Sequence, residues 1–276
     1  MARQRLGQHF LADEEWRERI SREIGVSRNS STFSVPGETK EFCWIEIGAG
    51  HGEMTQHLVA TGRPVIAVEL DPPLAKRLSE MASRTPNLTV QHQDVLKTDL
   101  RAAAAGRRVI IYGNLPYYIT SPILHHFFEF ADLIDEIHIV IQEEVALRLT
   151  AQSGKRDYGY LSVLTQYFSR PIIALEIPRR AFQPPPEVSS VLVSMRLPGE
   201  NRALKLAEDQ EFLEFVKLCF AQKRKTLVNN LRGISDPGAT REGLEALGLS
   251  PKARAEELSV RQLADLFRKF PMKETR

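Results

Sequence analysis

Between residues 42 and 141, short apolar runs alternate with segments in which apolar residues recur every three or four positions. Short apolar runs are typical of buried strands, and the longer period is typical of helices that bury one face. This alternation predicts an α/β fold with a parallel sheet, right-handed connections and helices on both faces. The expected strands span residues 43–48, 64–69, 88–92, 108–113 and 136–141, and the expected helices lie near 53–61, 72–83, 96–104 and 121–131.

The same patterns extend to both sides of this region. Asp13 can cap a helix that runs to about Ile24, because Trp16, Ile20 and Ile24 are four apart. Further helices are expected at residues 142–151 and 159–168, and further strands at 171–177 and 189–196, the last of which could pair antiparallel. After Pro198 the apolar pattern is helical only. We therefore predict a mostly parallel seven-stranded sheet in residues 1–197 and a small all-helical domain in residues 198–276.

Composition and charge are those of an ordinary folded protein. The chain has 276 residues and a formal net charge of only +2, so the whole molecule shows no strong preference for nucleic acid. Residues 197–276 carry 15 Lys and Arg against 12 Asp and Glu, a modest local surplus. Cys43 and Cys219 lie far apart in apolar surroundings, which favours two buried free thiols. With no secretory signal pattern and no long apolar run, a cytoplasmic protein is expected.

The stretch from Tyr112 to Pro122 contains the first candidate functional residues. It follows the apolar run 109–111, so Asn114 and Tyr117 are expected at the carboxyl end of a parallel strand. In an open α/β sheet, ligands bind at this end. An amide, a proline-stiffened turn and an aromatic ring suit a planar substrate such as a nucleobase. The alternative is a plain strand-to-helix loop with proline and polar punctuation.

A glycine-rich turn follows the first strand of the sheet. Gly48, Gly50 and Gly52 permit a close approach of the backbone to a ligand where the next helix begins. A dinucleotide fingerprint requires glycine where Glu53 stands, and a carboxylate there would repel a pyrophosphate. The turn therefore favours a cofactor without phosphate groups.

Acidic residues follow the second and third strands. Glu69 lies 21 residues beyond Gly48, a separation suited to a carboxylate that accepts hydrogen bonds from a ribose diol. Asp94 could accept from an adenine amino group, although acidic residues at such positions often only cap helices. With the glycine turn, they predict an adenosine moiety bound without phosphate. The cofactor that fits this description is S-adenosylmethionine.

Methyl transfer from a sulfonium is an in-line displacement, so the protein mainly has to align donor and acceptor. The side-chain oxygen of Asn114 and the carbonyl of Leu115 suit an exocyclic amine, and Tyr117 can stack on the base. Phe182 precedes a stiff proline-rich segment, and its ring is expected to be either the opposite wall of a base sandwich or a plug under a loop. A base held in this way must be unstacked, which points to nucleic acid. The mechanism requires no metal.

Taken together, these motifs resemble those of a known family, the ribosomal RNA adenine N6,N6-dimethyltransferases. The similarity is closest to the bacterial small-subunit enzymes that dimethylate two adjacent adenosines near the 3′ end of 16S rRNA, and it runs from residue 3 to about residue 232. It implies a Rossmann-like class I methyltransferase domain with a helical C-terminal domain. The residues that carry it are Gly7-Gln8-His9-Phe10-Leu11, Glu46-Ile47-Gly48-Ala49-Gly50, Glu69-Leu70-Asp71, Gln93-Asp94, Gly113-Asn114-Leu115-Pro116-Tyr117 and Phe182-Gln183-Pro184-Pro185-Pro186-Glu187-Val188-Ser189.

By position, the resemblance implies a set of site residues. The family often has asparagine where this chain has His9, and the segment 27–39 is longer than usual. The implied cofactor contacts are His9, Leu11, Gly48, Glu69, Asp94 and Asn114, and the catalytic set is Asn114, Leu115, Tyr117 and Phe182.

The compact basic run Lys223-Arg224-Lys225 could be a solvated helix end or part of a surface that contacts RNA phosphates. The expected partner is 16S rRNA in the 30S subunit, with the protein a monomer. Two kinds of alternative remain: a DNA adenine or protein glutamine N-methyltransferase, and a ribosome-assembly or RNA-binding factor in which catalysis is secondary. The full set expected to contact RNA adds Arg3, Arg5, Lys155, Arg156, Arg179 and Arg180.

Overall fold

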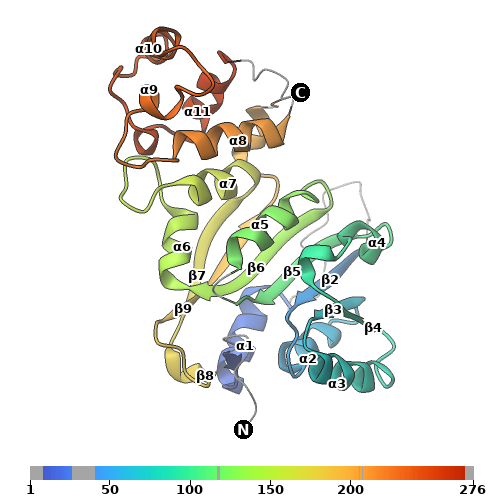
Figure 1. The fold of residues 1–276 in the computed structure, drawn as a ribbon. Helices are drawn as coiled ribbons and strands as arrows, with labels where there is room; N and C mark the ends of the chain where they lie inside the picture. Colours follow the sequence, from blue (N-terminus) through green and yellow to red (C-terminus); the bar gives the residue numbers. More distant parts are fainter. Residues whose placement is uncertain (1–8, 27–40, 117–118, 205, 207, 271–276) are drawn as a thin grey trace. The chain divides into compact units, whose positions relative to one another are not determined.

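The structure is a computed structural model that describes residues 9–26, 41–116, 119–204, 206 and 208–270 (Figure 1). The chain divides into two compact units, residues 1–146 with 172–197 and residues 147–171 with 198–276. The expected boundary after residue 197 coincides with one of these divisions. Residues 147–171, which we expected in the first domain, group with the C-terminal helices instead, because the helix they contain packs against those helices.

Seven strands form one sheet in the order β4-β3-β2-β5-β6-β9-β7. Strands β2 to β6 are parallel, and β9 runs antiparallel to β6. The predicted seven-stranded, mostly parallel sheet is confirmed, including the antiparallel pairing of the last strand. The strands are β2 (Phe42–Ile47), β3 (Val65–Glu69), β4 (Leu88–His92), β5 (Arg108–Asn114), β6 (Ile134–Gln142), β7 (Arg170–Ile177) and β9 (Ser190–Arg196).

Helices connect the strands where the apolar periodicity predicts them. Asp13 caps the first, its carboxylate accepting from the backbone N–H of Glu15 at 3.0 Å. The expected helix near 96–104 is divided, because Asp94 and Asp99 each cap a separate turn. The elements are α1 (Glu14–Glu23), α2 (Glu53–Val59), α3 (Pro72–Ala82), the 3₁₀ turn η1 (Val95–Lys97), α4 (Leu100–Ala104), α5 (Thr120–Phe128) and α6 (Glu143–Thr150).

In the central strands of the sheet, both faces are buried. Successive strand residues point to opposite faces, and in β2 both Trp44 and its neighbour Ile45 are fully or almost fully buried. The Trp44 face belongs to a core that includes Ile20 of α1 and Leu58 of α2. Burial on both faces explains why these strands are continuous apolar runs rather than alternating ones.

A two-stranded sheet lies outside the main one and was not predicted. Strand β1 (Phe10–Leu11) pairs antiparallel with β8 (Phe182–Gln183), which follows the 3₁₀ turn η2 (Arg179–Ala181). A two-residue strand is too short to produce a recognisable pattern of apolar positions. The pairing brings the start of the described chain next to the proline-rich segment.

The second unit is helical, as predicted for residues 198–276. Among its described residues after Pro198 there is no strand. Phe212 and Phe215 pack against Phe267, and the Tyr167 hydroxyl donates to Asp209 at 2.5 Å. Its elements are α7 (Tyr160–Phe168), the 3₁₀ turn η3 (Glu200–Leu204), α8 (Asp209–Cys219), α9 (Leu227–Asn230), α10 (Pro237–Glu245), the 3₁₀ turn η4 (Ala255–Glu257) and α11 (Val260–Phe267).

Both cysteines are buried free thiols, as expected. Burial raises the pKa of Cys43 to about 11, so this thiol stays protonated and unreactive at neutral pH. No helix in the described part of the chain is long and apolar enough to cross a membrane.

Candidate active site

The sheet order places a topological switch point between β2 and β5. From β2 the chain proceeds outward through β3 and β4 on one side, and then returns to β5 on the other. In open α/β sheets a crevice forms at such a point, outside the carboxyl ends of the strands. Gly48 follows β2 and Asn114 ends β5, so these two predicted site residues flank the crevice.

The glycine turn after β2 has a backbone that requires glycine. Gly48, Gly50 and Gly52 have φ angles of +66°, +60° and +89°, in the left-handed region that side chains disfavour. A Cβ on Gly50 would also lie 3.1 Å from Cε1 of Phe10. The turn is thus shaped for close approach of its backbone to neighbouring groups.

Glu69 holds the glycine turn in place. Its Oε2 accepts a hydrogen bond from the backbone N–H of Gly50 at 2.8 Å, and its Oε1 accepts from that of Asp71 at 2.9 Å. The residue is only 3% exposed. Glu69 therefore has a structural task, because it ties the turn to the end of β3, while its contact with ribose stays a prediction.

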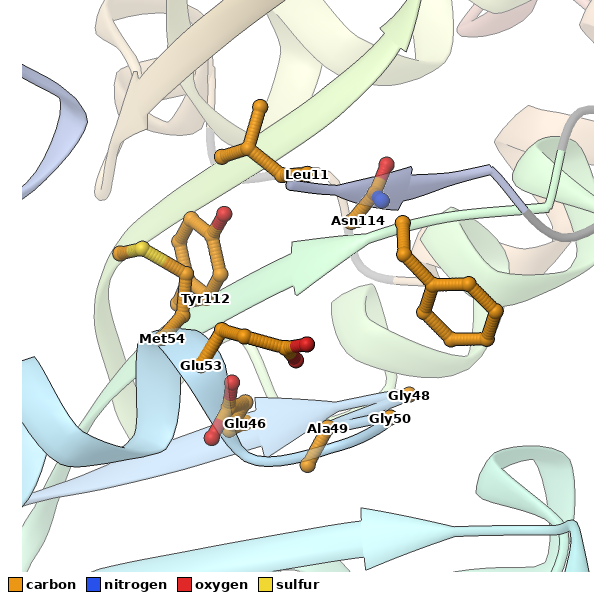
Figure 2. A pocket seen from close by; sticks show the side chains of 10 residues that line it. Leu11, Glu46, Gly48, Ala49, Gly50, Glu53, Met54, Tyr112 and Asn114 are labelled. Carbon is orange, nitrogen blue, oxygen red and sulfur yellow. The ribbon is translucent and has the colours of Figure 1, made fainter. Parts of the chain in front are cut away.

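A pocket lies between the glycine turn, the end of β5 and strand β1 (Figure 2). Three of the predicted cofactor contacts, Leu11, Gly48 and Asn114, line it, whereas Glu69 and Asp94 lie outside its lining at the neighbouring strand ends. Sequence reasoning did not assign a pocket role to Phe10, Ala49, Met54 or Tyr112. The lining residues are Phe10, Leu11, Glu46, Gly48, Ala49, Gly50, Glu53, Met54, Tyr112 and Asn114.

His9 contacts Asn114, which lines the pocket. The side-chain amide of Asn114 donates to the His9 carbonyl at 2.8 Å, and His9 Nδ1 is 2.8 Å from the Pro184 carbonyl. His9 thus connects β5 with the proline-rich segment through its backbone and its ring. The remaining acceptor of Asn114, Oδ1, receives no hydrogen bond from a described residue.

Of the other predicted site residues, Asp94 caps η1 by accepting from the Leu96 N–H at 3.0 Å. The Leu115 side chain is buried, and its N–H donates to the Val140 carbonyl at 3.1 Å, which fixes the turn after β5. Tyr117, Arg3 and Arg5 lie outside the described residues.

Phe182 is buried in the structure, and its expected base-stacking role stays a prediction. Its side chain is only 2% exposed and belongs to the same core as Leu11 and Trp16. The ring is held there because the Phe182 backbone pairs with Leu11 in the β1–β8 sheet. The other expectation, an apolar plug under a loop, describes its surroundings.

Glu46 is a buried acid at the base of the pocket. It is 2% exposed, and its Oε2 accepts from the Thr55 hydroxyl at 2.5 Å. Burial, reinforced by the nearby carboxylates of Glu53 and Glu69, raises the pKa of Glu46 to about 8. Burial, together with Glu46, also raises the pKa of Tyr112. Burial thus favours the neutral form of the Glu46 carboxyl group near neutral pH.

This buried carboxyl predicts a stability effect. The folded protein retains the Glu46 proton up to about pH 8, whereas the unfolded chain releases it near pH 4.5. The folded state thus binds more protons across this window, so the free energy of unfolding decreases as pH rises from 4.5 to 8. The Glu46→Gln variant has no proton to lose at this position, so its free energy of unfolding should not show this decrease. In thermal melts, the melting temperature of the variant minus that of the unmodified protein should therefore increase from pH 5 to pH 8. If the difference in melting temperature between the two proteins were the same at pH 5 and pH 8, the raised pKa of Glu46 would be contradicted.

Two basic segments meet in the second unit. Lys223 Nζ donates to the Arg156 carbonyl at 2.5 Å, and the side chains of Lys155, Arg224 and Lys225 are exposed beside them. The contact assembles one basic surface from two parts of the chain.

In the first unit, Arg179 and Arg180 are also exposed, and Arg179 Nε donates to the Pro186 carbonyl at 2.6 Å. Arg179 thereby fixes the path of the proline-rich segment as well as presenting a charge. Its predicted contact with RNA stays a prediction.

The family model for ribosomal RNA adenine dimethylases matches residues 1–271 of the chain. The chain belongs to this family. The activity of this family is S-adenosylmethionine-dependent dimethylation of adenine in rRNA. Membership of the family confirms three predictions: that the protein is an enzyme, that S-adenosylmethionine is its methyl donor and that its substrate is an rRNA. The rival of a non-enzymatic factor is correspondingly disfavoured.

Relatives within the family are similar over almost the whole chain. The ribosomal RNA small subunit methyltransferase A of Acidobacterium capsulatum is 40% identical over 267 residues, covering 96% of this chain and 89% of the relative. The protein of the same name from Shewanella oneidensis is 34% identical over 262 residues, covering 95% and 91%. The similarity therefore includes both compact units.

Solved structures with the same fold include a dimethyladenosine transferase from Plasmodium falciparum, with a TM-score of 0.76 and 22% identity over 95% of this chain and 97% of that one. The 23S rRNA methyltransferase ErmE has a TM-score of 0.65 and 26% identity over 95% of this chain and 99% of its own. The class I methyltransferase fold is confirmed.

Proposed function

We propose that this protein transfers methyl groups from S-adenosylmethionine to N6 of two adjacent adenosines near the 3′ end of 16S rRNA. The product is N6,N6-dimethyladenosine in the small ribosomal subunit. The observation that carries the proposal is the placement of Asn114 beside the glycine turn at the switch point of the sheet. The names of the relatives, which are small-subunit methyltransferases, support the choice of 16S over other rRNA.

The residues present fit the methyl donor. The pocket combines left-handed glycines with two carboxyl groups and has no Lys, Arg or His in its lining. This favours a cofactor that carries positive charge and no phosphate. We assign Leu11, Gly48 and Asn114 to its amino-acid end, and Glu69 and Asp94 to its adenosine, with His9 contributing its backbone.

Asn114 and Leu115 would orient the acceptor. When bound, the cofactor supplies an electrophilic methyl group. The Asn114 Oδ1 and the Leu115 carbonyl accept the hydrogens of the adenine N6 amine, so that the nitrogen lone pair can point toward that methyl group. Such alignment can provide roughly 7–11 kcal/mol of the rate enhancement. Tyr117 remains our candidate for stacking on the base, and Phe182 would support the β1–β8 pair that closes the pocket.

The basic surface of the second unit predicts salt-dependent RNA binding. Reversing the charges of Lys223, Arg224 and Lys225 to Glu should weaken 16S rRNA binding and reduce the slope of log affinity against log salt, because fewer phosphate counterions are released. Filter binding at salt concentrations from about 50 to about 300 mM, a range that includes physiological ionic strength, measures both the affinity and the slope. The control reverses Lys76, Arg77 and Arg84, three exposed cations of the first unit. Unchanged binding and slope in the first variant would exclude this surface.

We further propose that the protein acts as a monomer in the cytoplasm during ribosome biogenesis. A strain that lacks the gene tests the target in cells. Reverse transcription of its 16S rRNA should read through the two adjacent adenosines, and the gene supplied on a plasmid should restore the stops that dimethyladenosine causes. Restored stops elsewhere in the rRNA would contradict the proposed position.

A further inference from the structure

The orientation of the Asn114 amide is set by strand β1. In Figure 2, Asn114 lies beside the strand that carries Leu11. The Asn114 Nδ2 donates to the His9 carbonyl at 2.8 Å, and only the nitrogen end of an amide can pair with a carbonyl oxygen. As long as the His9 carbonyl holds Nδ2, the amide cannot turn over, and Oδ1 is left for the acceptor amine.

The position of the His9 carbonyl depends on what holds β1. On one side, β1 pairs with the two residues of β8. Directly after β1, the N–H groups of Ala12 and Asp13 both donate to the Ala181 carbonyl, at 2.9 and 3.1 Å. An isolated pair of such short strands is a weak support, because it contributes few hydrogen bonds. A rigid β1 therefore requires a second anchor.

Arg17 of α1 supplies this second anchor. Its Nη1 donates to the Leu11 carbonyl at 3.0 Å and to the Ala12 carbonyl at 2.6 Å. Hydrogen bonds from an ionised donor are stronger than those between neutral groups. The helix that carries Arg17 is itself fixed, because its Trp16 and Ile20 side chains belong to the hydrophobic core. Arg17 thus ties the end of β1 to the body of the first unit.

We propose that Arg17 is a positioning residue for methyl transfer. It holds β1 in the place where the His9 carbonyl keeps Nδ2 of Asn114, and so presents Oδ1 to the acceptor amine. The inference deepens the proposed function and rests on the role of Asn114 in it. Arg17 does not line the pocket, so it acts on the reaction only through β1. Small displacements of an orienting group are costly to the rate, which is why a distant anchor matters.

Single-turnover methylation of small ribosomal subunits that lack the modification tests this role. S-adenosylmethionine is supplied well above the dissociation constant of each variant, so that weaker cofactor binding does not affect the rate. Arg17→Met keeps a long side chain without donors and should lower the rate about tenfold, less than Asn114→Ala, because the β1–β8 pair remains. One nitrogen makes both bonds, so the ammonium of Arg17→Lys can replace it and should keep the rate within about threefold of the unmodified protein.

A double variant separates positioning from a general loss of stability. In the Asn114→Ala background, Arg17→Met should change the rate less than about twofold, because the amide that Arg17 positions is already absent. A merely structural role would lower the rate by the same factor in both backgrounds. Arg19→Met is the matched control, since the Arg19 guanidinium lies 4.1 Å from the centre of the Trp16 ring on the same helix, and this variant should keep the unmodified rate. Melting temperatures verify that each variant is folded during the assay.

The outcomes distinguish this inference from the function on which it rests. An unmodified rate in Arg17→Met would overturn the positioning role while leaving the role of Asn114 in place. A tenfold loss that recurs in the Asn114→Ala background would also overturn it, because Arg17 would then act independently of the amide. An unmodified rate in Asn114→Ala, or no methylation by the unmodified protein, would instead contradict the proposed function.

Discussion

Replacing Asn114 by alanine should reduce methyl transfer at least about 100-fold, because the acceptor amine loses the oxygen that orients it. The Asn114 amide is also the donor to the His9 carbonyl at 2.8 Å, so the variant loosens the closure of the pocket. Single-turnover rates with saturating cofactor and rRNA measure the effect on chemistry. Wild-type rates in this variant would remove Asn114 from its proposed role.

Asn87→Ala is the matched control for this result. Asn87 donates to the carbonyls of Val59 and Arg63 at 2.9 and 2.8 Å, close to the start of β3 and β4. The substitution removes the same chemical group and similar backbone hydrogen bonds, but at the opposite end of the strands from the pocket. It should lower the melting temperature while leaving the rate of methyl transfer nearly unchanged.

Glu69→Ala should weaken cofactor binding at least about 100-fold, since two charge-assisted hydrogen bonds to backbone N–H groups are lost together with the proposed ribose contact. The Gly50 N–H would then lose its partner, and the glycine turn would no longer be tied to β3. Calorimetry with S-adenosylhomocysteine measures the change. A dissociation constant within a few-fold of that of the unmodified protein would contradict both the proposed ribose contact of Glu69 and its role in holding the glycine turn.

Asp71→Ala provides the comparison for Glu69. The Asp71 side chain caps α3 at the Leu74 N–H, 3.3 Å away, while its backbone N–H still reaches Glu69. We expect a stability loss of about 1 kcal/mol from the missing cap, with cofactor binding preserved. A loss of binding as large as that of Glu69→Ala would mean that general loosening of this strand end, rather than the Glu69 carboxylate, explains the result.

The main elements of the fold were predictable because each produces a periodic pattern. Buried strands such as β5 are apolar runs, and α1 has its cap at Asp13 and its buried residues four apart. The β1–β8 pair was not predictable, because two residues form no pattern and their pairing connects segments more than 170 positions apart. The grouping of residues 147–171 with the C-terminal helices likewise depends on packing between distant segments.

The site was predictable where a sequence motif reflects a particular backbone conformation, such as a glycine turn or the end of a strand. Gly48, Gly50 and Asn114 follow from the turn and the strand end, and the structure places them together. The sequence left two roles open for Phe182, and the pairing with β1 that accompanies its burial was not predicted. Glu46 was visible in the motif, but its raised pKa arises from burial, which the sequence alone does not quantify.

The most direct test of the central claim is methylation of defined substrates with tritiated S-adenosylmethionine, followed by nucleoside analysis. The substrates are small ribosomal subunits that lack the modification, naked 16S rRNA and duplex DNA. We expect N6,N6-dimethyladenosine from the subunits, at two adjacent positions near the 3′ end of 16S rRNA, and no labelled product from DNA. Label found only in DNA or in ribosomal protein would contradict the assignment.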